Sequence, residues 1–357
     1  LGSRGLGDVY KRQIMFDHLL PTCLPLDGDH LKYGYQFAEE FGARKVHAGD
    51  GICHQLMPEL GYARPGDVVF VTDSHTTTYG AVSAFSTGIG YTEMAAVLGT
   101  GEMWVRVPSA IKIQIDGTLP DGVCSKDIAL RILGDLKAAG GTYKSLEFCG
   151  STIDAMPVDE RLTIANMAVE CGAKVGLFAP TKESCAYSNV KYDDVSWLHF
   201  DDDAEYEKVL TYKAEDMVPY IAAHPYVDNV KPLSELEGMK VDKVFIGSCT
   251  NGRLQDLAAA ARILDGHHIA PHIELLITPA SRSIFKQAIA LGYVEKLVRA
   301  GAMFTHPYCS LCEGRSGGLL CDDEVLLGTN NRNFLGRLGS PKSKTCLLYT
   351  SDAADDK

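Results

Sequence analysis

The carboxyl-terminal third of the chain alternates between short apolar runs and longer segments in which apolar residues recur every three or four positions. The short runs predict strands at 241–246, 273–277 and 302–305, and the longer segments predict helices at 253–264 and 281–291. Strands that alternate with helices are usually joined by right-handed crossovers and form parallel sheets. We therefore expect a parallel-rich sheet in this region.

The middle of the chain repeats this alternation. Strands are predicted at 67–72, 111–115 and 144–148, and the first of them is expected to be buried because it is almost wholly apolar. An amphipathic helix is predicted from its N-cap Ser125 to about residue 137. A second helical pattern covers 158–171 and places Asn166 and Glu170 on one face, four residues apart.

Proline residues and an acidic stretch divide the chain into three α/β units. Pro108 closes the first unit, and the run Asp201-Asp202-Asp203 followed by Pro225 marks a polar connection to the third. The predicted units are 14–108, 109–222 and 223–344.

The two ends of the chain lack this patterning. Residues 1–13 and 345–357 resemble translated adapter sequence, so we predict that they are a non-native leader and a non-native tail. The fold is expected to lie within residues 14–344.

Composition narrows the functional classes. The net charge of −12 and the lack of a Lys/Arg-rich run argue against nucleic-acid binding as the main role. The sequence contains no apolar stretch of the ~20 residues that a membrane span needs and no signal peptide, so we expect a cytoplasmic protein that does not bind membranes. Eleven scattered cysteines argue against a framework of structural disulfides.

Three of these cysteines stand in motifs with chemical meaning. Cys249 lies in Gly-Ser-Cys-Thr-Asn-Gly-Arg after a predicted strand, and Cys309 and Cys312 form a Cys-x-x-Cys after another. The pair alone is also compatible with a thioredoxin-like redox pair or with half of a zinc site to which His306 could contribute. Three thiolates favour an iron–sulfur cluster in which one iron lacks a protein ligand and can act as a Lewis acid.

Histidines and carboxylates gather near predicted strand ends. They are Asp17-His18, the isolated His54, Asp73-Ser74-His75, and the pair Asn166 and Glu170. A carboxylate that bonds an imidazole fixes its tautomer and raises its basicity, which suits a general acid. The alternative for each histidine is an ordinary core or surface residue, and the density of such residues at strand ends weakens that alternative.

A third motif is basic and lies near the carboxyl end. In Asn331-Arg332-Asn333-Phe334-Leu335-Gly336-Arg337 two arginines stand five residues apart. Arginine grips carboxylates through two parallel hydrogen bonds, although many arginines are only solvated surface residues. This motif could therefore hold an acidic substrate.

Together these motifs resemble the aconitase superfamily, in particular its two-subunit branch of 3-isopropylmalate dehydratases and homoaconitases. The resemblance covers about residues 16–340, and the motifs occur in the order and approximate spacing of the family. It rests on Asp17-His18, Gly51-Ile-Cys-His54-Gln, Thr72-Asp-Ser-His-Thr-Thr-Thr-Tyr-Gly80, Asn166-Met-Ala-Val-Glu170, Gly247-Ser-Cys-Thr-Asn-Gly-Arg253, the Cys-x-x-Cys, and Asn331-Arg-Asn-Phe-x-Gly-Arg337.

The resemblance implies an aconitase-like α/β fold of three units around a 4Fe–4S cluster held by Cys249, Cys309 and Cys312. It also implies reversible dehydration of a hydroxy di- or tricarboxylic acid. His18, oriented by Asp17, would protonate the leaving hydroxyl. The resemblance also implies two supporting acid–histidine pairs, His54 with Asp73 and His75 with Glu170. The residues that it implies around the substrate or the cluster are Ser74, Asn166, Asn251, Asn331, Arg332 and Arg337.

Relatives of this kind need a partner. The swivelling domain that supplies the catalytic base in single-chain members is absent from this sequence, so the resemblance implies a separate small subunit. 3-Isopropylmalate is the first substrate candidate, and homoaconitate, 2,3-dimethylmalate and citrate types are alternatives. Two functions of other classes remain as alternatives: an RNA-binding protein that has lost its cluster, and a protein with a structural metal site.

One motif departs from the family pattern. The family commonly has Cys-Gly-Pro-Cys-x-Gly, whereas this chain has Cys309-Ser-Leu-Cys312-Glu313-Gly314. Both thiols remain, and Glu313 adds a negative charge beside them.

Overall fold

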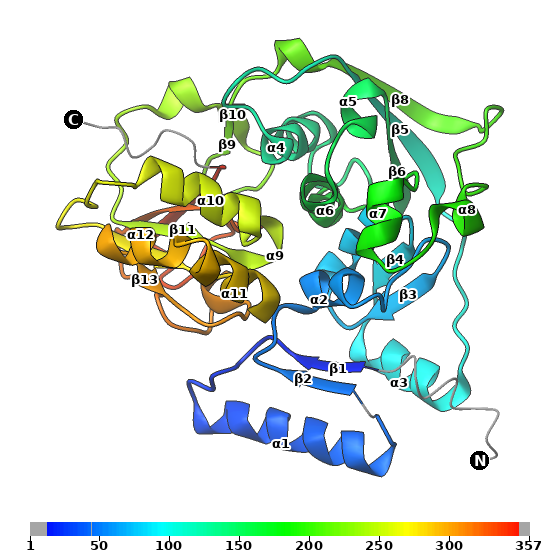
Figure 1. Ribbon diagram of the computed structural model, residues 1–357, viewed down its shortest axis with the longest axis horizontal. Helices are drawn as coiled ribbons and strands as arrows, with labels where there is room; N and C mark the ends of the chain where they lie inside the picture. The colour runs from blue at the N-terminus through cyan, green and yellow to red at the C-terminus, as the bar shows by residue number, and fades with distance from the viewer. Residues whose placement is uncertain (1–12, 44, 350–357) are drawn as a thin grey trace.

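A computed structural model describes residues 13–43 and 45–349, and Figure 1 shows their arrangement. The largest sheet has seven strands in the order β10-β9-β15-β14-β11-β12-β13. Strands β15, β14, β11, β12 and β13 run parallel, and β9 and β10 close one edge in antiparallel pairs. The strands are β9 (Tyr220–Ala222), β10 (Val230–Pro232), β11 (Lys243–Ile246), β12 (Glu274–Ile277), β13 (Met303–Phe304), β14 (Val325–Gly328) and β15 (Lys344–Leu347).

Helices connect the parallel strands of this sheet, as the alternating pattern predicts. The short helix α9 follows β11, and α11 and α12 follow β12. Ser281 caps α11 by accepting a hydrogen bond from the backbone N–H of Ile284. The helices are α9 (Ser248–Asn251), α10 (Leu254–Ile263), α11 (Arg282–Ala290) and α12 (Tyr293–Arg299).

The second sheet has four parallel strands in the order β7-β6-β5-β8. Helices α4 and α6 pack together in Figure 1 beside this sheet. The elements are β5 (Ser109–Asp116), α4 (Ser125–Leu136), β6 (Lys144–Cys149), α5 (Ser151–Asp154), α6 (Val158–Met167), the 3₁₀ helix η3 (Ala168–Cys171), β7 (Val175–Phe178), α7 (Lys182–Tyr187), α8 (Tyr192–Val195) and β8 (Tyr206–Lys213).

The amino-terminal part forms two small parallel sheets, β1-β2 and β3-β4. The predicted strand at 67–72 is present but is not buried, and Val68 is 63% exposed. The reason is that β3 has only one neighbouring strand among the described residues. The elements are β1 (Gln13–Phe16), α1 (Pro25–Glu40), β2 (Lys45–Ala48), α2 (Cys53–Glu59), β3 (Val68–Val71), the 3₁₀ helix η2 (Ser74–Val82), β4 (Phe85–Gly88) and α3 (Tyr91–Thr100).

Two details differ from the sequence-based expectations. Ser125 is the first helical residue of α4 and not its N-cap. Cys124 holds that position, and its N–H donates to the Asp127 carboxylate at 2.9 Å. Residues 345–347, which we expected to lie outside the fold, belong to β15 and are buried, because β15 lies inside the sheet between β14 and β9. Gln13 opens β1, whereas residues 1–12 and 350–357 lie outside the described residues.

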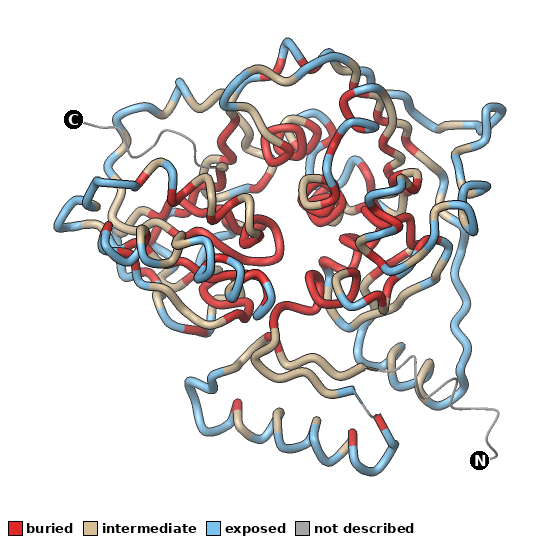
Figure 2. Tube along the Cα trace, in the orientation of Figure 1, coloured by how far each residue is buried: buried red, intermediate tan, exposed pale blue. Residues whose placement is uncertain are grey.

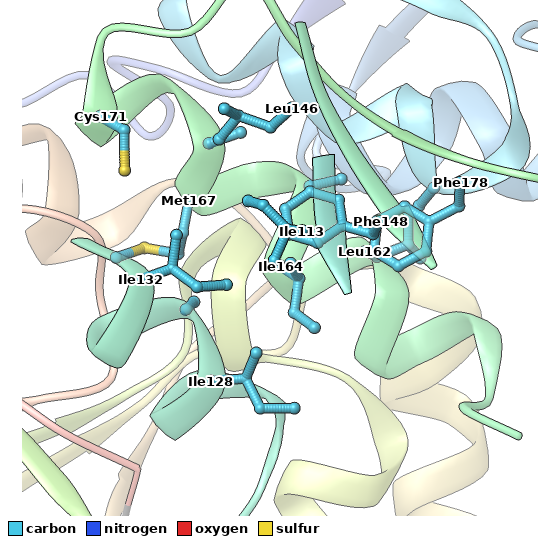
Figure 3. Packing of buried hydrophobic residues seen from close by; sticks show 14 of the residues in the cluster. Ile113, Ile128, Ile132, Leu146, Phe148, Leu162, Ile164, Met167, Cys171 and Phe178 are labelled. Carbon is cyan, nitrogen blue, oxygen red and sulfur yellow. The ribbon is translucent and has the colours of Figure 1, made fainter. Parts of the chain in front are cut away.

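One hydrophobic core joins the first two predicted units. Residues of η2 lie in the same buried cluster as the apolar faces of β5, β6, α4 and α6. Figure 3 shows Phe148 and Phe178 side by side in this cluster, and their rings stack with centroids 4.8 Å apart. The unit boundaries at 108, 222 and 344 stay a prediction, since the core crosses the first of them and β9 joins the seven-stranded sheet just before the second.

Phe148→Ala is expected to lower the free energy of unfolding by about 3–5 kcal/mol, because the buried ring leaves a cavity and Phe178 loses its stacking partner. Urea unfolding followed by circular dichroism measures the change. Val209→Ala in β8 is the matched control, since its side chain is 54% exposed, and it should cost much less. Equal effects of the two variants would contradict this view of the core.

Candidate functional site

The three motif cysteines converge although sixty residues separate them. Cys249 lies in α9, directly after β11, and Cys309 and Cys312 follow β13 around the 3₁₀ helix η6 (Ser310–Glu313). These positions are the carboxyl ends of parallel strands, where open α/β sheets place their ligands. All three side chains are buried. The prediction that the strand ends bring them together agrees with this geometry.

Asparagine side chains bridge the thiols. The Asn331 Oδ1 atom lies 3.4 Å from the Cys312 sulfur and 3.9 Å from the Cys249 sulfur. Asn166 in α6 donates from Nδ2 to the Cys249 sulfur at 3.2 Å and also bonds Asn331. Two of the predicted residues therefore contact the sulfur site directly.

Burial makes the free thiols poor acids. It raises the pKa of Cys249 to about 12, an effect that Cys312 strengthens and that the hydrogen bond from Asn166 partly offsets. Burial also raises the pKa of Cys309 and Cys312, and each of the other two thiols raises that of Cys309 further. Three buried thiols that interact with one another fit a group that binds sulfur and displaces their protons.

The acid–histidine pairs predicted from sequence are formed. His18 donates from Nδ1 to Asp17 at 2.8 Å, and His54 donates from Nε2 to Asp73 at 2.7 Å. The His18 Nε2 atom lies 3.8 Å from the other oxygen of Asp73. Asp73 therefore links the two pairs, and its pKa lies well below the usual range because the two histidines His54 and His75 outweigh its burial.

A third pair extends this network toward the basic motif. His75 donates from Nε2 to Glu170 at 3.0 Å, and Arg332 donates from Nε to the same oxygen at 2.8 Å. The backbone N–H of His75 donates to Asp73 at 2.8 Å. Burial opposes ionisation of Glu170, but His75 and Arg332 together lower its pKa. A connected network of acidic and basic side chains thus runs from Asp17 to Arg332.

The acid–histidine network and the cysteines form one site. The ligand atoms of Asp17, His18 and Cys309 all lie within 4.8 Å of one another, and the Cys309 N–H donates to the Asp17 carbonyl at 2.8 Å. Burial lowers the pKa of His18, but Asp17 outweighs it, and with Asp73 and Glu313 raises that pKa to about 9. His18 is therefore protonated at neutral pH, and its side chain remains 41% exposed.

Three predicted residues make less direct contacts. The Ser74 hydroxyl lies 3.5 Å from the His75 Nδ1 atom. Asn251 donates to Asp256 at 3.3 Å and not to a cysteine of the site, and its Oδ1 atom is buried without a hydrogen-bond partner among residues 13–43 and 45–349. The Arg337 Nε atom is likewise buried and unpartnered within the described part of the chain. Arg337 still acts on the site. Burial raises the pKa of Cys312, and the charge of Arg337 offsets part of that rise.

His306 is not positioned like the cysteines. Its Nε2 atom lies 3.2 Å from the Leu20 carbonyl, and its ring stacks on Tyr308 at a centroid distance of 4.4 Å. This contact fits a structural role for the histidine that we considered as a zinc ligand.

Two buried cations support the site and were missed by the sequence analysis. Arg253 donates to the carbonyls of Cys249 and Thr250, each at 2.7 Å, and so fixes the loop that presents Cys249. Lys126 donates from Nζ to the carbonyls of Thr329 and Asn330, at 3.0 and 2.9 Å, next to Asn331. Arg253 stood at the end of a recognised motif, whereas no pattern distinguished Lys126 from a surface lysine.

The elements that carry these residues meet in the middle of the molecule. Helices α6 and α9 contact each other, as do α6 and η2. Figure 2 shows that the segments around α2, α6 and α9 are among the buried parts of the chain and face one another. Among the helices of residues 13–43 and 45–349, none is long and apolar enough to cross a membrane.

Comparison with known proteins identifies the family of this chain. The family model described as the aconitase family (aconitate hydratase) matches residues 29–236 and 223–354. The 3-isopropylmalate dehydratase large subunit 2 of Archaeoglobus fulgidus is 44% identical over 96% of this chain and 83% of its own length. Large subunit 1 of the same enzyme from Thermotoga maritima is 42% identical over 97% of this chain and 84% of its own.

A relative with a different named activity and a solved structure are also similar to this chain. A probable methanogen homoaconitase large subunit from Methanothermobacter thermautotrophicus is 40% identical over 99% of this chain and 84% of its own length. The crystal structure of aconitase X from Thermococcus kodakaraensis has the same fold at 12% identity, with a TM-score of 0.52 over 87% of this chain and 72% of that one. The match of the family model and the identity to these relatives show that the chain belongs to the aconitase family.

Proposed function

We propose that this chain is the large subunit of a hydro-lyase that reversibly dehydrates a hydroxy dicarboxylic acid, with 3-isopropylmalate as its substrate. The observation that carries the proposal is the junction of three buried thiols with three acid–histidine pairs at one point of the fold. The names of the relatives from Archaeoglobus fulgidus and Thermotoga maritima support the choice of substrate.

We propose that Cys249, Cys309 and Cys312 hold a 4Fe–4S cluster. The donor set fits, because all three are free, buried thiols and thiolates are the ligands that such clusters take. The family implies an iron–sulfur group as well. When bound, a cluster with three protein ligands supplies a Lewis acid for the substrate hydroxyl.

His18 is the proposed general acid. Asp17 holds the Nδ1 atom of His18, so the proton that can be donated sits on Nε2. Since hydroxide is a poor leaving group, protonation of the departing hydroxyl lowers the barrier to elimination. The partial exposure of His18 allows a substrate to reach it.

The basic motif is proposed to hold the substrate carboxylates. Arg332 is oriented by Glu170, and the Nε of Arg337, which has no partner within residues 13–43 and 45–349, leaves a buried donor for an anionic group. Positive charge near the carboxylate next to the reacting carbon stabilises the negative charge that builds up when the C–H bond breaks.

We infer that a small subunit supplies the base that removes this proton, as the term large subunit in the names of the relatives suggests. The partner would also complete the substrate pocket. A cytoplasmic location suits the eleven free thiols, and the net charge of −12 argues against a role in nucleic-acid binding.

The homoaconitase-like relative supports a second candidate substrate on the same scaffold. Anaerobic reconstitution of the chain with iron, sulfide and a small subunit from a related enzyme tests both. We expect turnover of 3-isopropylmalate to exceed that of homocitrate, citrate and 2,3-dimethylmalate. Preference for homocitrate would assign the second function, and protein that stays free of iron under these conditions would refute the hydro-lyase proposal.

A further inference from the structure

The turn that carries His18 has an unusual backbone. Leu19, which follows His18, has a φ angle of +57°. Residues other than glycine avoid this left-handed region, because the Cβ atom then crowds the backbone, and they keep such a conformation only where neighbouring groups enforce it. Something outside the turn must therefore hold the backbone around His18.

The loop with the Cys-x-x-Cys motif provides these contacts. The Cys309 N–H donates to the Asp17 carbonyl at 2.8 Å. The Leu19 N–H donates to the Glu313 Oε2 atom at 3.0 Å, across 294 positions of sequence. A charged acceptor makes the second bond the stronger kind of hydrogen bond. Glu313 is itself fixed, because the Ser316 hydroxyl bonds its other carboxylate oxygen.

We propose that Glu313 is a positioning residue for the reaction, because its carboxylate holds the Leu19 amide and thereby fixes the left-handed turn that aims His18 at the substrate. Position 313 is the variable position of the Cys-x-x-Cys-x-Gly pattern. Its neighbour Gly314 is restricted, since it has a φ angle of +75° and a Cβ atom there would lie 1.9 Å from the Arg337 carbonyl oxygen. The effect on catalysis rests on the proposed role of His18, whereas the contact itself does not.

Hydrogen exchange tests the contact without iron, partner or substrate. The Leu19 amide of the full chain should exchange slowly, and Glu313→Ala should speed its exchange by about 10-fold or more, because no acceptor oxygen is left at position 313. Glu313→Gln keeps an acceptor oxygen and should stay close to the unsubstituted chain. Unchanged exchange at Leu19 in Glu313→Ala would overturn the proposal, even if the function proposed above were wrong.

Kinetics of the reconstituted enzyme test the consequence. Glu313→Ala should lower kcat by about 10- to 100-fold with KM and iron content unchanged, and Glu313→Gln should restore most of that loss. Glu295→Ala in α12 is the control, since Glu295 is 67% exposed and pairs with Arg299 of the same helix. Loss of iron in Glu313→Ala would show a merely structural role for Glu313, and failure of Glu313→Gln to restore kcat would show that the hydrogen bond is not the cause. Either result would overturn the proposal.

Discussion

Cys312→Ser is expected to remove bound iron and hydro-lyase activity together. Serine keeps the size of the side chain but offers an oxygen in place of the soft thiolate that iron–sulfur clusters require. Cys312 also shares Asn331 with Cys249, so its loss disturbs the arrangement of a second ligand. After anaerobic reconstitution, iron and sulfide per chain and the broad visible absorbance should fall sharply, with turnover below detection.

Cys185→Ser is the matched control for this change. Cys185 lies fully buried in α7, so its substitution places a hydroxyl in the core but leaves the three proposed ligand thiols intact. That variant should lose some stability and keep its iron. If Cys312→Ser retained iron and full turnover, the assignment of the three cysteines as ligands would be wrong.

Asp17→Asn should lower kcat by about 10³- to 10⁴-fold, the size of loss seen when a carboxylate that orients a catalytic histidine becomes an amide. One oxygen of Asp17 fixes His18, and the other accepts the backbone N–H of Cys53 at 2.6 Å. An amide preserves the shape but removes the charge that holds the proton of His18 on the reactive nitrogen. Steady-state kinetics of the reconstituted enzyme measure the loss, and iron content should stay unchanged because Asp17 is not a proposed ligand.

A second acid–histidine pair provides the control for Asp17→Asn. His47 donates from Nδ1 to Asp50 at 3.0 Å, just after β2, and this pair is not part of the Asp17–Arg332 network. Asp50→Asn therefore removes the same charge from the same kind of pair and should leave kcat close to that of the unsubstituted enzyme. Wild-type kcat in Asp17→Asn would rule out His18 as the oriented acid.

The parts of the fold that the sequence predicted are those with strong periodicity. Between β11 and β13, the predicted strands and the predicted helices at 253–264 and 281–291 agree with the observed elements to within one or two residues at each end. Strand β8 was missed because it lies at an edge, and its mostly exposed residues, such as Glu207 and Lys208, give no apolar run. The prediction that β3 is buried was wrong, because the apolar character of a strand does not show how many strands will flank it.

The candidate site was predictable where chemistry depends on residue type in a short motif. The cysteines and the acid–histidine pairs fall in this class, although the link from His18 to Asp73 appears only in three dimensions. The supporting role of Lys126 could not be predicted, because the sequence does not distinguish a lysine that is buried among carbonyl groups from one in solvent. Arg253 belonged to a recognised motif, but its contacts with the carbonyls of Cys249 and Thr250 appear only in the structure. Their cost of burial is offset by hydrogen bonds that they donate to distant segments, Lys126 to the Thr329 carbonyl and Arg253 to the Gln55 side chain.

The place of β15 in the large sheet bears on how the protein folds as it leaves the ribosome. The four strands of the second sheet have all been synthesised by residue 213, whereas β14 and β9 lack their shared neighbour until Leu347 has been synthesised. Until then the nascent chain presents two open strand edges, which are sites for misassociation. The sheet whose strand ends carry Cys249 and Cys312 is therefore completed only after residue 347 has been synthesised.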